Sequence, residues 1–154
     1  MIVRAMAVVI VCALMLQARV PAQGSSTPAD ERERIRQVAL DYIDGWYSGD
    51  ANRIASALHP ELAKRMVATR IEEGRPISAL DQQSAMTLVE ATRAGGGRQI
   101  APANRRNTVT VLDVFGNAAS VRIDAATWID YLHFAKWNGE WKIVNVLWEL
   151  RPDR

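Results

Sequence analysis

Two polar side chains among apolar residues carry the clearest chemical signal in the chain. Asp130 lies before an Asn-Gly pair, Asn138-Gly139, and Asn145 lies after it. If the flanking runs pair as a hairpin, both side chains fall on one apolar sheet face, where loss of water makes a carboxylate a stronger base and a candidate general base. The alternative is an Asp130 at the open end of a strand, bonded to backbone or facing water, because structural contacts perturb carboxyl groups as well.

Three further polar side chains are candidate ligand contacts. His59 precedes Pro60 at an expected helix end, where an imidazole is either a base at a cavity mouth or only a partner for carbonyl groups. Lys64 and Arg65 follow, and Arg65 suits a planar anion better because its guanidinium presents a rigid fork of donors. The alternative for both is solvated surface. Asp130 and His59 are therefore the candidate catalytic residues.

Two aromatic residues, Tyr42 and Trp46, share one face of an expected helix. They either stack on a flat ring or belong to the core, which is the more frequent role at this spacing. The candidate ligand-binding residues are thus Tyr42, Trp46, His59, Arg65, Asp130 and Asn145.

The sequence predicts no metal site and no cofactor. His59 and His133 lack the spacing of metal ligands, and the single cysteine, Cys12, falls inside an expected signal peptide. Residues 95–97, Gly-Gly-Gly, end an expected helix instead of opening one, so they do not form a phosphate-binding loop.

The hairpin that places Asp130 is predicted by Asn138-Gly139, because these residues tolerate the positive φ of a type I′ turn. A two-residue turn sets the register: Trp137 opposite Glu140, Phe134 opposite Ile143, Leu132 opposite Asn145 and Asp130 opposite Leu147. Alternation assigns Trp128, Asp130, Leu132, Phe134, Trp141, Ile143, Asn145 and Leu147 to one face, and Ile129, Tyr131, His133, Ala135, Val144, Val146 and Trp148 to the other.

Helices are expected before the strands. Thr27-Pro28 predicts the start of a helix that ends near Ser48-Gly49, and Asp50 caps a short second helix that His59-Pro60 stops. Residues 61–67 favour one more helical turn, residues 69–80 stay unassigned, residues 82–94 predict a third helix, and residues 95–106 predict a loop.

Two strands, residues 108–115 and 118–125, are expected to pair around Gly116-Asn117. With the C-terminal hairpin they complete a four-strand antiparallel meander, and helices followed by such a meander indicate the α+β class. The register of the first pair places on one face the residues Thr110, Leu112, Val114, Ala119, Val121 and Ile123.

Residues 1–22 have the features of a secretory signal peptide: a basic start at Arg4, an apolar run over residues 5–16, and the small-residue site Val20-Pro21-Ala22. The run is too short for an ordinary membrane span, although an uncleaved anchor is the alternative. We expect residues 23–29 to form a flexible leader and residues 30–154 a single exported domain, periplasmic or secreted.

The charge balance disfavours polyanionic partners. Two of the 19 Lys and Arg residues, Arg4 and Arg19, would leave with the signal peptide, which gives 17 against 17 Asp and Glu. A net charge of zero without basic runs predicts no nucleic-acid partner and, after removal of the signal peptide, no membrane partner.

Several segments together resemble a known superfamily. They are residues 41–47 with Gly49-Asp50, residues 58–60 with 63–65, residues 110–114, residues 130–133 with Lys136, and Gly139 to Val146. They resemble the nuclear transport factor 2-like superfamily and, within it, the SnoaL-like group called putative lumazine-binding proteins. The resemblance implies a cone-like, curved antiparallel sheet packed on N-terminal helices, with a cavity at its open end and a pterin- or lumazine-like ligand.

A fold of this kind does not decide the function, which depends on the site. We expect an exported module that binds a small, flat, largely apolar molecule without catalysis. One alternative is an enzyme of the isomerase or dehydratase type, with Asp130 or His59 as its general base. The other is a structural or dimerisation domain whose cavity is filled by its own side chains.

The second apolar face of the hairpin predicts a homodimer. A monomer seldom leaves a continuous apolar patch in water, and a sheet face can pair with its own copy about a two-fold axis. The alternative is that the leader or the loop at residues 95–106 covers it. The expected interface comprises Ile129, Tyr131, His133, Val144, Val146 and Trp148.

Overall fold

The computed structural model describes residues 27–152, so the predicted signal peptide and most of the leader lie outside the described residues. This part of the chain forms three α-helices, two short 3₁₀ helices and six strands. In chain order they are α1 (Pro28–Ser48), α2 (Ala51–Ala57), β1 (Leu58–Glu72), β2 (Arg75–Ser84), α3 (Ala85–Arg93), η1 (Gly96–Gln99), η2 (Pro102–Asn104), β3 (Thr108–Phe115), β4 (Ala118–Asp124), β5 (Trp128–Trp137) and β6 (Glu140–Leu150).

The two N-terminal helices begin at the predicted caps. The Thr27 hydroxyl accepts a hydrogen bond from the Asp30 amide, and the Asp30 carboxylate accepts one from the Thr27 amide, which completes a capping box. Helix α1 ends at Gly49, whose φ of 68° is left-handed. The Asp50 carboxylate then accepts hydrogen bonds from the first free amides of α2.

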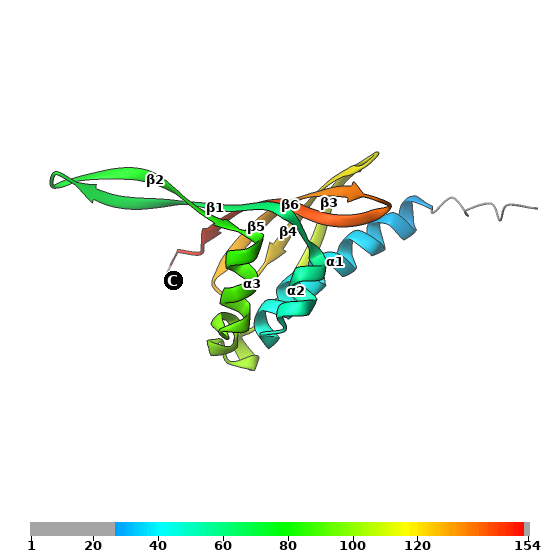
Figure 1. The fold of residues 1–154 in the computed structure, drawn as a ribbon, viewed down its shortest axis with the longest axis horizontal. Coiled ribbons are helices and arrows are strands. Elements are labelled where there is room, and N and C mark those ends of the chain that lie inside the picture. Colours follow the sequence, from blue (N-terminus) through cyan, green and yellow to red (C-terminus); the bar gives the residue numbers. More distant parts are fainter. Residues whose placement is uncertain (1–26, 153–154) are drawn as a thin grey trace, which may run out of the picture.

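The strands form one curved sheet in the order β2-β1-β6-β5-β4-β3, with the three helices on one side of it (Figure 1). Strand β1 runs parallel to β6, and every other neighbouring pair is antiparallel. The predicted α+β class and curved sheet on N-terminal helices are therefore confirmed. The predicted four-strand antiparallel meander is present as strands β3 to β6. The sheet has two further strands, β1 and β2, in segments that were predicted as a helical turn and left unassigned. Helix α3 begins at Ala85 and not at the predicted residue 82, because β2 continues to Ser84.

The hairpin of β1 and β2 projects well beyond the rest of the sheet (Figure 1). Its turn residues Glu73 and Gly74 both have positive φ. Val67, Ile71 and Leu80 are 52%, 69% and 58% exposed. A hairpin with both faces in solvent needs no alternation of apolar and polar residues, and this explains why the sequence pattern did not reveal it.

The turn between β5 and β6 has the predicted type I′ geometry. Asn138 has a φ of 51° and Gly139 a φ of 84°. The register next to the turn is confirmed, with Trp137 opposite Glu140 and Phe134 opposite Ile143.

Beyond that point a β-bulge changes the register of β6. Phe134 pairs with Ile143, but His133 pairs with Asn145, so that Val144 is the extra residue. The predicted pairs Leu132–Asn145 and Asp130–Leu147 are wrong for this reason; Leu132 pairs with Val146, and Asp130 pairs with Trp148.

The bulge also reverses which side chains of β6 face the helices, because one extra residue inverts the alternation of a strand. Val146 is fully buried, and Trp148 packs against the core. Both were expected on the outer face, and that prediction is wrong. Leu147, expected inside, is 50% exposed. Within β5, which carries no extra residue, the faces are as predicted, with Asp130 fully buried and Tyr131 43% exposed.

A second bulge has the same effect in β3. Val111 pairs with Val121 and Asp113 with Ser120, which makes Leu112 the extra residue. The prediction that Thr110 and Leu112 share one face with Val121 is therefore wrong. Val121 is fully buried, whereas Thr110 is exposed and Leu112 is 51% exposed.

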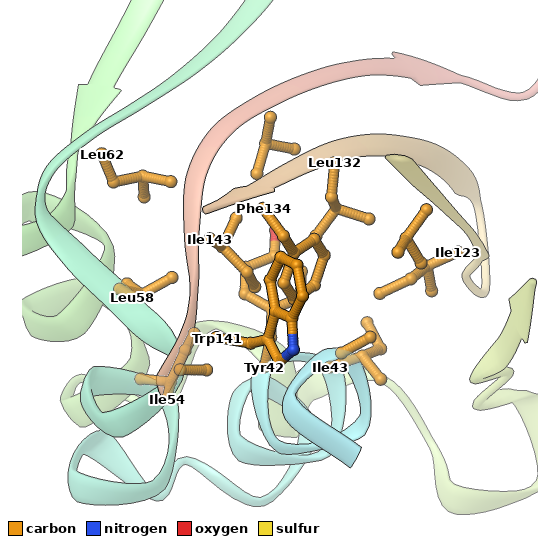
Figure 2. Close-up of a cluster of buried hydrophobic side chains, with 14 of the residues drawn as sticks. Tyr42, Ile43, Ile54, Leu58, Leu62, Ile123, Leu132, Phe134, Trp141 and Ile143 are labelled. Atoms are coloured by element: carbon orange, nitrogen blue, oxygen red, sulfur yellow. The ribbon is translucent and has the colours of Figure 1, made fainter. Parts of the chain in front are cut away.

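The core lies between the concave face of the sheet and helix α1. Figure 2 shows Trp141 and Phe134 between the strands and the helix residues Tyr42 and Ile43. All four side chains are almost completely buried.

Replacing Gly139 with Val should destabilise the protein. A β-branched residue at a φ of 84° is strained, and such strain lowers the free energy of unfolding by about 1–3 kcal/mol. Urea denaturation measures the effect. Gly24→Val, in the leader predicted from the sequence, is the control. An unchanged urea midpoint for Gly139→Val would contradict the role of this turn.

The homodimer stays a prediction, but its surface moves with the bulge. The exposed outer face carries the pair Tyr131 and Leu147 of β5 and β6, and the pair Val67 and Leu80 of the projecting hairpin. Arg65 lies opposite Leu147 and separates these two pairs of apolar residues. Exposed apolar side chains gathered on one sheet face are typical of protein interfaces. Leu147→Glu should therefore shift a dimer toward monomer in light scattering, and a wild-type monomer at micromolar concentration would exclude the dimer.

Candidate functional site

A cavity of ≈ 270 Å³ lies between the helices and the strands β1, β5 and β6. Buried lining residues form its floor, and the exposed residues Gln83 and Leu150 stand at its rim. The lining residues are Tyr42, Ile43, Trp46, Ile54, Lys64, Gln83, Leu88, Gly96, Ile100, Trp128, Trp148 and Leu150.

Four aromatic side chains make the cavity suitable for a flat ring. Tyr42 and Trp46 come from α1, where a spacing of four residues places them on one face. Trp128 comes from the start of β5 and Trp148 from β6. Trp148 reaches the cavity only because of the bulge at Val144. Tyr42 and Trp46 thus lie where the sequence predicted, whereas the role of the two β-strand tryptophans was missed.

Trp46 is held in place by the glycine triplet. A Cβ atom on Gly96 would come within 2.6 Å of the Trp46 ring, and one on Gly97 within 2.3 Å of the Trp46 carbonyl oxygen. Only residues without a side chain allow η1 to pass so close to α1. The triplet therefore ends α3, as predicted, and also forms part of the cavity wall, which was not predicted.

Lys64 is the most unusual side chain of the site. It is 7% exposed, although a lysine is almost never buried without a partner. Its Nζ atom donates hydrogen bonds to the Tyr42 hydroxyl and to Asp130 Oδ1, both at 2.7 Å, and lies 5.0 Å from the ring centroid of Trp148. The interpretation of Lys64 as solvated surface is wrong, because β1 pairs with β6 and carries Lys64 into the interior.

Asp130 lies behind the cavity wall. It is 0% exposed, and it is not among the lining residues. Its Oδ1 atom accepts from Lys64, and its Oδ2 atom accepts from the indole N–H of Trp128 at 2.8 Å. Each oxygen therefore has a strong donor, and the carboxylate serves to fix two residues of the wall. The alternative interpretation, in which Asp130 lies at an open strand end and is bonded to backbone or faces water, is therefore also wrong.

The Tyr42 hydroxyl stays protonated at neutral pH. Burial raises its pKa well above the ordinary value, and the neighbouring Asp130 carboxylate raises it further. The phenol can accept from Lys64 and still donate its own proton, so that Lys64, Tyr42 and Asp130 form one connected polar group at the cavity floor.

Three predicted site residues lie elsewhere. His59 Nδ1 accepts a hydrogen bond from the Glu61 amide at 3.2 Å, and its ring packs edge-on against Trp137 near the β5–β6 turn. Arg65 donates to Asn145 Oδ1 at 3.1 Å on the outer face of the sheet. Arg65 follows Lys64 in the same strand and so points the opposite way, and the bulge turns Asn145 outward. None of the three lines the cavity.

Residues 27–152 contain no group of His, Cys, Asp and Glu side chains that could hold a metal ion. In the same part of the chain, no helix has the length and apolar character needed to cross a membrane.

Comparison with known proteins identifies the family. A family model described as "Putative lumazine-binding" matches residues 30–149. The chain belongs to this family. The resemblance noted in the sequence is thereby confirmed, and the family match covers nearly all of the described domain. Among curated proteins, none matches the chain.

Solved structures described as nuclear transport factor 2-like share the fold of this chain. A nuclear transport factor 2-like protein of unknown function from Shewanella baltica has a TM-score of 0.63 at 18% identity, over 83% of this chain and 99% of that one. One from Methylobacillus flagellatus has a TM-score of 0.61 at 18% identity, over 82% and 97%. One with a cystatin-like fold from Novosphingobium aromaticivorans has a TM-score of 0.53 at 16% identity, over 82% and 92%. At these identities the likeness concerns the fold alone.

Proposed function

We propose that the protein is a small-molecule-binding module that holds a flat, largely apolar ligand in the cavity beside Trp148. The observation that carries the proposal is an open cavity walled by Tyr42, Trp46, Trp128 and Trp148, with one polar group at its floor. Apolar walls with a few placed polar atoms are typical of ligand pockets.

The size of the cavity supports a ligand of one or two fused rings. Small-molecule pockets span about 300–1,000 Å³, and the cavity here, at ≈ 270 Å³, lies just below that range. Lumazine, the bicyclic pteridine dione in the family description, is a suitable first ligand for this volume.

Binding without catalysis is the function that the site supports best. An isomerase or dehydratase would need a base that can reach its substrate, but Asp130 is enclosed and bonded through both oxygens, and His59 lies away from the cavity. The alternative of a purely structural domain required a cone filled by its own side chains, and the cavity argues against it.

Titration of the protein with lumazine tests the proposal. We expect saturable one-to-one binding by calorimetry, with about tenfold weaker affinity in Trp148→Ala, because stacking of a base-like ring on an aromatic side chain is worth about 1–3 kcal/mol. Trp137→Ala is the matched control, since Trp137 is 55% exposed and does not line the cavity. An equal loss of affinity in both variants would contradict the proposed function. The same conclusion would follow if the wild type bound neither lumazine nor an unsubstituted bicyclic ring.

We also propose that the module is exported, on the basis of Arg4, the apolar run at residues 5–16 and Val20-Pro21-Ala22. Protein recovered from the exported fraction of its own host should have the mass of a chain that begins at Gln23. An intact mass that still includes residues 1–22 would show that cleavage does not occur.

A further inference from the structure

The buried ion pair at the cavity floor presents only one of its two charges to the cavity. Lys64 is the only charged residue among the lining residues that the structure describes, and its partner Asp130 lies behind it without lining the cavity. The ion pair is close to neutral as a whole, yet a molecule in the cavity meets the ammonium side of it first. A ligand is therefore exposed to a buried hydrogen-bond donor with a positive charge.

The ammonium group also has donor capacity left. It carries three N–H donors, and within residues 27–152 the structure assigns two of them, to Tyr42 and to Asp130. The Trp148 ring is its other close neighbour, 5.0 Å from Nζ to the ring centroid. Because Lys64 is 7% exposed, bulk water has little access to the third donor. A donor in this position favours a ligand that brings an acceptor to it.

We propose that Lys64 determines the specificity of the cavity by selecting a flat ring with an acceptor oxygen, either a carbonyl or an anionic oxygen, at one edge. This inference rests on the proposed binding function. The ring plane of the ligand packs against Trp148 and Trp46, and the ligand oxygen accepts a hydrogen bond from the remaining N–H of Lys64. A cationic ring of the same shape is rejected, because it would place two positive charges together in an apolar cavity.

Asp130 makes this donor a fixed one. Its two oxygens hold Lys64 Nζ at 2.7 Å and the Trp128 indole at 2.8 Å, so that one buried carboxylate orients both the donor and a wall of the cavity. A preorganised charged donor needs little rearrangement when the ligand binds, and a hydrogen bond to such a donor is stronger than one between neutral groups.

Three bicyclic probes of similar shape test the proposal. Lumazine presents carbonyl oxygens, naphthalene presents no acceptor, and N-methylquinolinium carries a positive charge. For the wild-type protein we expect the affinities to fall in that order, with lumazine at least about tenfold tighter than naphthalene, the usual size of a charge-assisted hydrogen bond. Saturation-transfer NMR can follow all three probes under the same conditions.

The informative variant is Lys64→Met/Asp130→Asn, which removes the ammonium group without leaving a buried carboxylate unpaired and keeps an acceptor for Trp128. We expect its preference for lumazine over naphthalene to disappear and N-methylquinolinium to gain affinity, while naphthalene still binds. Lys136→Met is the matched control, because Lys136 is a partly buried lysine paired with Glu31 and does not line the cavity. This control should keep the wild-type order.

The outcomes separate this inference from the function on which it rests. Wild-type protein that binds naphthalene as well as it binds lumazine would overturn the role of Lys64 and leave the binding function intact. The same conclusion would follow if the double variant kept its preference for lumazine. Wild-type protein that binds none of the three probes would overturn both proposals. If the double variant lost naphthalene as well, Lys64 would only hold the cavity open, and the specificity role would be wrong.

Discussion

Replacing Asp130 with Ala should lower the free energy of unfolding by about 3–5 kcal/mol, the range found when one partner of a buried ion pair is removed. Lys64 would remain 7% exposed without its carboxylate, and the Trp128 indole would lose its acceptor. The change also affects three elements at once, because the pair joins β1 to β5 and, through the Tyr42 hydroxyl, to α1. Urea denaturation at neutral pH measures the loss.

A second variant distinguishes the unpaired charge from the lost packing. Lys64→Met/Asp130→Leu removes both charges and should recover most of the stability, since apolar replacement of a buried pair is often neutral or stabilising. If the single and double variants were equally unstable, packing would explain the loss and the charge would not. An Asp130→Ala variant as stable as the wild type would mean that the pair is accessible to water.

Replacing Trp141 with Ala should have an effect of similar size, about 3–5 kcal/mol, as is typical for a large aromatic residue removed from a core. Trp141 is 4% exposed and lies between β6 and α1 (Figure 2). Its indole N–H also donates to Glu31 Oε2 at 2.6 Å and so connects the start of α1 to the sheet. Loss of the ring leaves a void and removes this bond.

Trp137→Ala serves as the control, because Trp137 belongs to the same hairpin but is 55% exposed. Its replacement should change the urea midpoint only slightly. If the two variants lost similar stability, the effect would come from the hairpin and not from burial of the Trp141 ring. Trp141→Phe should lie between the wild type and Trp141→Ala, since it keeps most of the volume and loses the bond to Glu31.

Much of the fold could be predicted from local signals. The Thr27 cap, the Asp50 cap and the Asn138-Gly139 turn each act over a few residues, and the structure has all of them. The projecting hairpin has no such signal: its strands are largely exposed on both faces, and Pro60 at the start of β1 favours the end of a helix without indicating a strand.

The candidate site was harder to predict because it depends on non-local pairing. Lys64 becomes buried only through the parallel pairing of β1 with β6, between segments about eighty residues apart, as in the pair Lys64 and Val146. No local pattern distinguishes it from Arg65, the next residue, which lies on the outer face. Asn145 and Trp148 were exchanged between the two faces by a bulge whose position nothing in the local sequence marks.

The extra residue at Val144 determines which alternate side chains of β6 face the cavity. Insertion of one residue directly after Val144, with the bulge kept, would exchange every later side chain of β6 between the two faces, so that Leu147 would replace Trp148 beside Lys64. The strand would keep its neighbours, yet an aliphatic side chain would take the place of an aromatic one in the cavity wall. A single-codon insertion could thus change the class of molecule that this scaffold accepts in one step, without a gradual series of substitutions.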